Sequence, residues 1–221
     1  MADLDMNRIA AAALRVADEA GASGFTMRAV ADALDVTPMA LYHYVEDKAA
    51  LAALVVDASI KEHPLAAPTG IWQDDLWAMA DWMRRTTVAH PAVGELRRTY
   101  RVWTPAILPM TERWLSLWQQ SGLDLGPALV AATTSSMAIA GLVAEEAVFR
   151  TLDTPDEAAL ASFPNARLVF DTKHDRDSDY ELLVRSLIEG LHARLMRESD
   201  SHQANTKGRE SRPRPRSRTK I

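Results

Sequence analysis

The chain has 221 residues, of which 48% are hydrophobic and 25% are charged, and its formal net charge is −5. Its length and apolar content are enough for one or two domains with a real hydrophobic core. The sequence has no cysteine, which excludes disulfides and thiolate chemistry; it shows no signal peptide at its start, and polar residues break its longest apolar run before about 18 residues. We therefore expect a cytoplasmic protein that has no membrane partner.

Charge is distributed unevenly along the chain. Residues 1–60 hold four basic and nine acidic side chains, whereas residues 199–221 hold seven basic and two acidic ones. The segment 199–221 has almost no apolar residues, so we expect a disordered basic tail there. Two roles stay open for this tail, a solubilising end and a loose contact with phosphate.

The first part of the chain predicts four successive helices. The first covers about residues 4–19, and Thr26 can cap the second because its hydroxyl can accept a hydrogen bond from an unpaired amide of the first turn. Thr37, followed by Pro38 at the first helical position, opens the third helix, and Asp47 can cap the fourth. This order is typical of a helix-turn-helix, whose second helix lies in the major groove of DNA. It predicts double-stranded DNA as the partner; an ordinary orthogonal three-helix bundle is the alternative.

The rest of the chain also predicts helices only. The expected segments are, in chain order, residues 47–63, 72–89, 93–102, 104–120, 127–152, 154–163 and 179–197, with a charged loop at 171–179. No strand-like alternation of useful length occurs, so we predict an all-α fold. We expect a helix-turn-helix DNA-binding domain at 1–60, a larger helical domain for effector binding and dimerisation at 61–198, and the basic tail at 199–221.

Several of these motifs resemble one known family. They are Gly24–Arg28, Thr37, Leu41–Val45 and the acidic-lysine helix start at Asp47-Lys48. From about Asn7 to Ile60 the chain resembles the N-terminal domain of the TetR family of bacterial transcriptional regulators, and residues 180–195 are similar to the last helix of its tetracycline-repressor-like branch. The resemblance implies DNA contacts by Thr26, Arg28, Thr37, Pro38, Met39, Ala40, Tyr42, His43 and Lys48, with Lys48 holding a phosphate.

The expected recognition helix has unusual chemistry. Met39 and Ala40 cannot hydrogen-bond a base well, so they can only touch thymine methyls or other apolar features of the groove. Hydrogen-bonded readout would then fall on Arg28, over a purine such as guanine, and on His43. For Tyr42 the alternative is packing of its ring in the core, and for His43 it is an ordinary surface position.

Two helices have the composition of a subunit interface. The helix at 127–152 carries small residues that permit close packing, and the last helix carries an apolar face wider than one-sided packing needs. We expect both to pair with their twofold copies in a four-helix bundle, as the resemblance also implies, whereas burial within one subunit is the alternative. The expected interface residues are Ala140, Ala144, Tyr180, Leu183, Val184, Leu187 and Leu191.

Six tryptophans lie between residues 72 and 118, and large aromatic and methionine side chains suit a pocket for a flat or lipophilic effector. An effector cavity is implied by the resemblance, and ordinary core is the alternative for each tryptophan. The candidate effector residues are Trp82, Trp103, Trp114, Trp118, Met110, Met137 and Glu145. No cluster has recognisable metal-ligand spacing, so we propose no metal and no cofactor here.

These observations predict a homodimeric repressor that a small lipophilic or aromatic effector releases from a palindromic operator. The alternative is an activator, or a regulator without a ligand, of the same fold. A helical enzyme is a remote alternative, because the sequence shows no nucleophile–base pair, carboxylate pair or phosphate-binding glycine loop.

Overall fold

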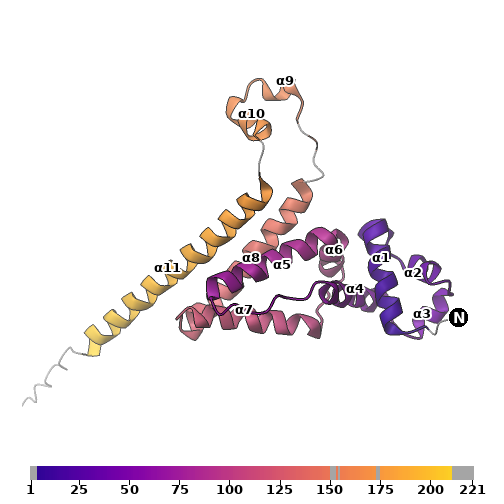
Figure 1. Cartoon of the computed structure of the whole chain (residues 1–221), viewed down its shortest axis with the longest axis horizontal. Coiled ribbons are helices and arrows are strands. Elements are labelled where there is room, and N and C mark those ends of the chain that lie inside the picture. Colours follow the sequence, from indigo (N-terminus) through magenta and orange to yellow (C-terminus); the bar gives the residue numbers. More distant parts are fainter. Residues whose placement is uncertain (1–3, 150–152, 154, 173–174, 211–221) are drawn as a thin grey trace, which may run out of the picture.

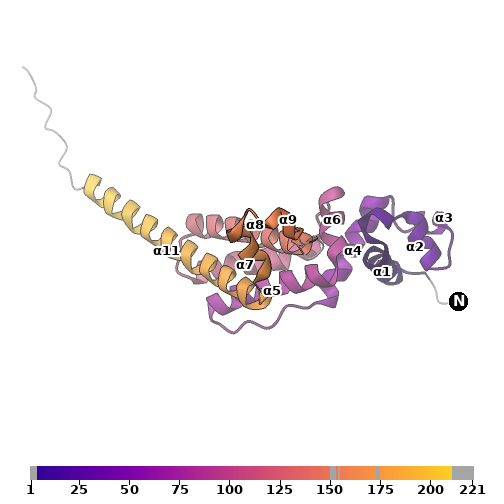
Figure 2. The same ribbon diagram turned by 90° about the horizontal axis from the view of Figure 1, so that it is seen from above.

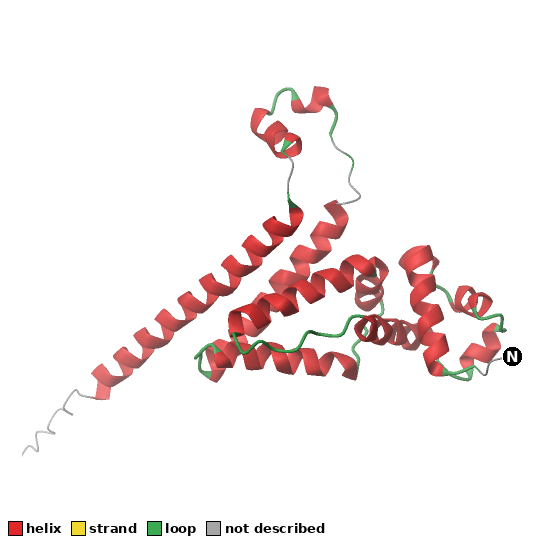
Figure 3. Ribbon diagram, viewed as in Figure 1, coloured by secondary structure: helices red, strands yellow, loops and turns green. Residues whose placement is uncertain are grey.

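The computed structural model describes residues 4–149, 153, 155–172 and 175–210, which form helices and no strand (Figure 1, Figure 3). This confirms the all-α prediction. The helices are α1 (Met6–Gly24), α2 (Met27–Ala33), α3 (Pro38–Tyr42), α4 (Lys48–Glu62), α5 (Trp72–Ala89), α6 (Pro91–Thr99), the 3₁₀ turn η1 (Pro105–Ile107), α7 (Leu108–Gln120), α8 (Leu125–Phe149), α9 (Glu157–Leu160), α10 (Pro164–Asp171) and α11 (Arg176–Glu210).

Helices α1 to α4 form an N-terminal unit at one end of the molecule (Figure 1, Figure 2). Its core contains the fully buried side chains of Ile9, Phe25, Leu41 and Leu51. Helix α1 breaks at Gly21, whose φ of 67° lies in the left-handed region that glycine adopts without strain. The chain can therefore turn there and begin α2.

A second unit consists of α5, α7, α8 and α11, which pack around another core. Trp118 and Ile139 are completely buried in it, together with Leu76 of α5 and Val184 of α11. In Figure 1, α5, α7 and α8 lie in the middle of the molecule, and α11 runs beside them and continues beyond them.

Helix α6 joins the two units. Its buried residues Ala92 and Leu96 belong to the core of the N-terminal unit, although α6 follows α5 in the chain. The expected domain boundary at residue 60 also falls inside α4. Helices α4 and α6 pack on each other and on α1, and α6 also packs on α5, so these helices connect the two units.

Several helix boundaries differ from the predictions. The helix expected at 154–163 is replaced by the shorter α9, and Pro164 then begins α10, because proline fits the first helical position, where no amide is required. Helix α11 begins at Arg176, before the predicted start, since the carboxylate of Asp175 accepts hydrogen bonds from the backbone amide of Asp177 (3.2 Å) and the hydroxyl of Ser178 (2.7 Å). Figure 1 shows α9 and α10 standing away from the other helices.

Helix α11 extends into the segment where we expected a disordered basic tail. Helix α11 continues from Arg176 through Glu210, well past residue 199. The sequence between 199 and 210 contains no proline, and polar residues such as glutamine, lysine and arginine are good helix formers even without a core to pack on. The Arg-Pro segment after residue 210 lies outside the described residues.

Helix α8 is long and apolar enough to cross a membrane, judged by its length and composition alone. The expectation that polar residues shorten this apolar run too far to span a bilayer therefore does not hold by this measure. Thr133, Thr134 and Ser135 donate hydrogen bonds to carbonyl oxygens one turn earlier, so their hydroxyl groups are satisfied within the helix. Core helices of soluble proteins pass the same test, and α8 packs one side against α5, α7 and α11. The remaining side of α8 is exposed.

Candidate nucleic-acid interface

Three side chains fix the starts of the helices in the N-terminal unit. Thr26 Oγ1 accepts a hydrogen bond from the amide of Ala29 (3.0 Å), and Thr37 Oγ1 accepts one from the amide of Ala40 (3.3 Å). Asp47 Oδ1 accepts one from the Ala50 amide at 2.8 Å. These three N-caps begin α2, α3 and α4 at the predicted residues.

The turn between α2 and α3 is tight. Asp35 adopts φ 56°, a left-handed conformation that aspartate tolerates better than most residues, and the amide of Val36 donates to the carbonyl of Ala31 (3.1 Å). The chain thus reverses within a few residues and places α3 across α2. This short turn gives the helix-turn-helix arrangement.

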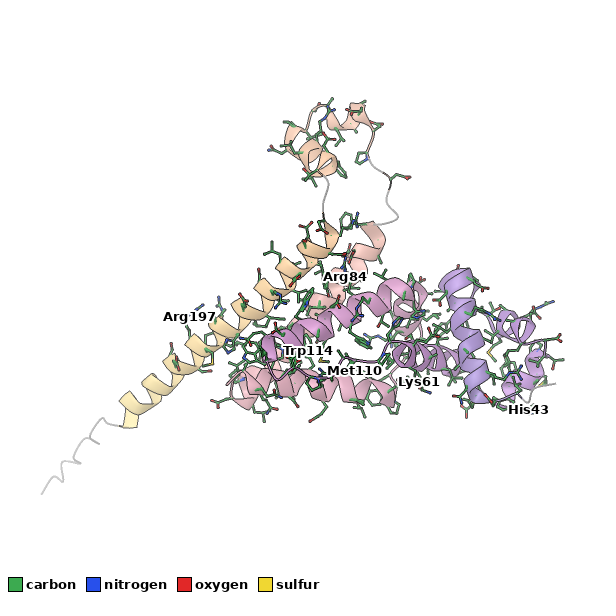
Figure 4. The ribbon with its side chains drawn as sticks, viewed as in Figure 1. His43, Lys61, Arg84, Met110, Trp114 and Arg197 are labelled. Atoms are coloured by element: carbon green, nitrogen blue, oxygen red, sulfur yellow. The ribbon has the colours of Figure 1, made fainter. Side chains whose placement is uncertain are left out.

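Helix α3 packs one side against the core of the N-terminal unit and exposes the other side. Leu41 is fully buried, while the Met39 side chain is 68% exposed and that of Tyr42 is 50% exposed. Exposure of Tyr42 disfavours the alternative of a ring packed in the core. His43 is also exposed and lies at the far end of the N-terminal unit (Figure 4). Pro38 is exposed and Ala40 half-buried on the same helix.

The two cationic candidates differ in their surroundings. The side chain of Arg28 is 85% exposed and lies 3.9 Å from Asp32 on the next turn of α2, a loose pair that leaves the guanidinium available to DNA. Lys48 is half-buried, and its Nζ lies 5.8 Å from the ring centroid of Phe25 and 5.3 Å from that of Tyr100. A phosphate contact by Lys48 therefore requires its ammonium group to leave these rings.

Sequence reasoning missed a role for Tyr44. Its hydroxyl donates a hydrogen bond to the carbonyl of Leu4 (2.8 Å), which ties the segment before α1 to the end of α3. The partner Leu4 lies 40 residues earlier in the chain, so the sequence around Tyr44 does not predict this contact.

The candidate effector residues do not converge on one place. Trp114 and Trp118 are buried in the second core, and Trp114 Nε1 donates to the carbonyl of Ala132 (3.0 Å) on α8. Met110 is half-buried on the same helix as Trp114 (Figure 4), and Trp82 donates a hydrogen bond from Nε1 to the carbonyl of His63.

Three expected effector residues lie on the surface instead. Trp103 is 65% exposed in the segment after α6, and Met137 is 73% exposed on the open side of α8. Glu145 is exposed too. Helical phase explains the exposure of Met137, because Ser135 and Ile139 take the inward positions of α8 and leave Met137 outside.

The expected dimerisation residues also divide into two groups. Tyr180 and Val184 are buried within their own subunit, and the Tyr180 hydroxyl donates to the carbonyl of Ala80 (2.8 Å), so placing them at an interface was wrong. Leu183 is 50% exposed, and Ala140 is exposed on α8. Ala144, Leu187 and Leu191 are half-buried.

Comparisons with known proteins agree with this geometry. The model of the bacterial regulatory proteins of the tetR family matches residues 9–55, and the model of the tetracyclin repressor-like C-terminal domain matches residues 63–195. The chain belongs to the TetR family. It is therefore a transcriptional regulator that binds DNA, and regulators of this family generally have no enzymatic activity.

Three similar proteins illustrate the TetR-family relationship. An HTH-type transcriptional regulator of Saccharopolyspora erythraea is 30% identical over 166 residues, which cover 74% of this chain and 70% of that protein. The HTH-type transcriptional repressor DrrR1 of Streptomyces coeruleorubidus is 33% identical over 135 residues, covering 58% of this chain and 48% of DrrR1. The structure of ActR from Streptomyces coelicolor in complex with actinorhodin has a TM-score of 0.68 and 26% identity, covering 87% of this chain and 98% of ActR.

One further polar cluster of this TetR-family chain escaped the sequence analysis. Arg84 of α5 is buried and pairs with both carboxylate oxygens of Glu146 on α8, each at 2.7 Å. It also bonds Asp177 of α11 at 2.8 Å and lies over the ring of Tyr180. The residues come from three helices that are distant in sequence, so no local sequence pattern predicts the cluster.

Proposed function

We propose that the chain is a homodimeric repressor that binds a palindromic operator and leaves it when a small lipophilic or aromatic effector binds. The observation that carries this proposal is the exposed face of α3, fixed from below by Leu41 and at its start by the Thr37 cap. The related DrrR1 is a transcriptional repressor, which favours repression over activation.

The exposed residues suggest how the operator is read. Met39 and Ala40 offer only apolar contacts, which suit thymine methyl groups, and the exposed guanidinium of Arg28 suits the O6 and N7 acceptors of guanine. Thr26, Thr37, Pro38, Tyr42, His43 and Lys48 complete the proposed contact set. The acidic balance of residues 1–60 means that these specific contacts, rather than general charge attraction, must supply much of the affinity.

Dimerisation is supported by apolar side chains on the open sides of α8 and α11. Val130 and Met137 of α8 and Leu183 of α11 are each about half exposed or more. A four-helix bundle formed with a second copy would cover them, with Ala140 allowing close approach. We therefore place Leu183, Leu187 and Leu191 at the interface and remove Tyr180 and Val184 from it.

Effector binding is proposed for the second unit, residues 61–198, near Trp114, Trp118, Met110 and Trp82. The complex of ActR with actinorhodin shows that a protein of the same fold binds a ligand. The effector would favour a conformation in which the two copies of α3 are wrongly spaced for successive major grooves, and α4 and α6 would transmit that change. Such a regulator would work in the cytoplasm.

A gel-shift experiment tests the proposal. The purified protein is titrated onto the DNA upstream of its own gene, and bound fragments are narrowed by footprinting. We expect a protected palindrome, and we expect Arg28→Gln to weaken binding by about 1–3 kcal/mol with relaxed preference at one base pair. Arg85→Gln, which changes an exposed arginine of α5, is the matched control. Equal losses in both variants would contradict the proposed role of Arg28.

A further inference from the structure

Three side chains with metal-binding atoms meet where the N-terminal unit joins the second unit. Glu62 and His63 lie at the end of α4, and His90 lies at the corner between α5 and α6. One oxygen of Glu62 and one ring nitrogen of each histidine all lie within 4.8 Å of one another. Lys61, labelled in Figure 4, marks this end of α4. His63 and His90 are distant in sequence, so the spacing of these residues does not predict a metal site.

His90 has an unusual set of neighbours. Its side chain is buried, with Nδ1 2.9 Å from Oδ2 of Asp18 on α1 and Nε2 3.4 Å from Oε2 of Glu62. Nε2 is buried and has no hydrogen-bond partner. When Nδ1 carries the ring hydrogen and its N–H donates a hydrogen bond to Asp18, the lone pair of Nε2 faces the Glu62 carboxylate. Two electron-rich atoms at that distance repel each other unless a positive charge lies between them.

The hydrogen bond between His90 Nδ1 and Asp18 is typical of histidines that bind a metal through their other ring nitrogen. A histidine that ligates a metal through one nitrogen almost always donates its other N–H to a carboxylate or carbonyl, which fixes the tautomer and orients the ring. Asp18 does this for His90 from α1, and the free Nε2 then points toward the side of the ring where Glu62 lies.

His63 is positioned independently of His90. Trp82 of α5 donates a hydrogen bond to its backbone carbonyl, which holds the end of α4 against α5. The rings of His63 and His90 are tilted by 57° with centroids 5.3 Å apart, so they approach without stacking flat. A cation bound between them would have two imidazole nitrogens and one carboxylate oxygen as ligands.

We infer that Glu62, His63 and His90 form a binding site for a divalent transition-metal ion such as Zn²⁺. Imidazole and carboxylate ligands suit zinc, and a site with three protein ligands leaves a fourth position for water. Asp18 is a positioning residue that acts through His90. No thiolate ligand is available, because the chain has no cysteine.

The location gives the ion a regulatory consequence. The three ligands connect α4, which leads to the recognition helix, with the corner between α5 and α6, and Asp18 adds α1. A bound ion would therefore resist relative movement of the two units. This consequence rests on the proposed function, but binding of the ion does not, so binding is measured on the protein without DNA.

The test is isothermal titration calorimetry of the full-length protein, without an affinity tag, using ZnCl₂. We expect saturable binding of one ion per chain, loss of that binding in His90→Gln and Glu62→Gln, and weakening by about tenfold to a hundredfold in Asp18→Asn. His43→Gln is the matched control, because His43 is exposed at the opposite end of the N-terminal unit and should leave binding unchanged. Glu62 is more than half exposed, so its variant should fold, which circular dichroism checks.

X-ray absorption of the zinc-loaded protein gives a second readout. We expect only nitrogen and oxygen neighbours at about 2.0–2.1 Å and the scattering of two imidazole rings. Absence of saturable binding would overturn the inference. Binding that persists in His90→Gln, or that disappears equally in His43→Gln, would also overturn it.

Discussion

Arg84 shows how much a single buried residue can determine in this fold. Glu146 is the main hydrogen-bond partner that raises the pKa of Arg84 above its usual value, against the opposing effect of burial, and Asp177 adds to it. The guanidinium therefore stays charged and holds α5, α8 and α11 together at one point.

Replacement of Arg84 by methionine should destabilise the protein strongly. The variant removes the guanidinium that neutralises the carboxylate of Glu146, which is only 12% exposed, so we expect the free energy of unfolding to fall by about 3–5 kcal/mol. Urea denaturation measures the change. Arg85→Met is the control, because that side chain is 65% exposed and its pair with Asp81 is worth about 1 kcal/mol or less. Similar losses in both variants would contradict this account.

Asp75 makes stability depend on pH. Burial disfavours its charged form, but hydrogen bonds from the amide and hydroxyl of Thr69 and the amide of Gly70 outweigh burial and lower the pKa of the carboxyl below 3.8. The stabilisation is therefore complete above the unfolded pKa and is lost as pH falls through the lower folded pKa.

We expect Asp75→Asn to reduce the free energy of unfolding at neutral pH by about 1–3 kcal/mol, with a smaller difference from the wild type below pH 3.8. Thr69→Val removes one donor and should raise the pKa of Asp75 toward its ordinary value. Denaturation curves between neutral and acid pH measure both effects. A difference that stays constant over this range would refute the link to the Asp75 carboxyl.

At the scale of elements, the N-terminal helices could be predicted because their signals are local. Thr26, Thr37 and Asp47 cap the helices that follow them, and Pro38 takes the first helical position, as the sequence indicates. Helix α10 was missed because proline can either end or begin a helix. The start of α11 was misplaced because several acidic residues near it could each serve as its N-cap.

Helix α3 allows a direct separation of stability from DNA binding. Leu41→Ala removes a fully buried side chain and should cost about 2–5 kcal/mol of stability. Met39→Ala, two residues earlier, changes a side chain that is 68% exposed, so stability should hold while operator affinity falls. Thermal unfolding and gel shift distinguish the two. Undiminished operator binding by the Met39 variant would show that α3 does not read DNA through this face.

At the scale of the whole molecule, the sequence could not separate inward from outward faces of apolar helices. Helix α8 carries small apolar residues on all sides, so its pattern does not reveal which of them pack within the subunit. Tyr180 and Leu183 belong to one apolar stretch, yet the first is buried by α5 and the second is exposed. Such assignments depend on neighbours that are distant in sequence, as does the junction of His63 and His90.

A charge on the open face of α11 should separate the two copies. Leu183→Glu places a carboxylate in the proposed four-helix bundle, and we expect a monomer with strongly reduced operator affinity. Light scattering coupled to size-exclusion chromatography measures the mass. Leu108→Glu, at an equally exposed position (50%) on α7, should leave the dimer intact. A dimeric Leu183 variant would place the interface elsewhere.

The central claim is that two symmetric copies of α3 read neighbouring turns of one duplex. Native mass spectrometry of the protein on its footprinted operator tests it most directly. We predict two chains per duplex, with protected half-sites centred about one helical turn, or a multiple of it, apart. A single chain bound to an asymmetric site, or no complex with any upstream fragment, would contradict the claim.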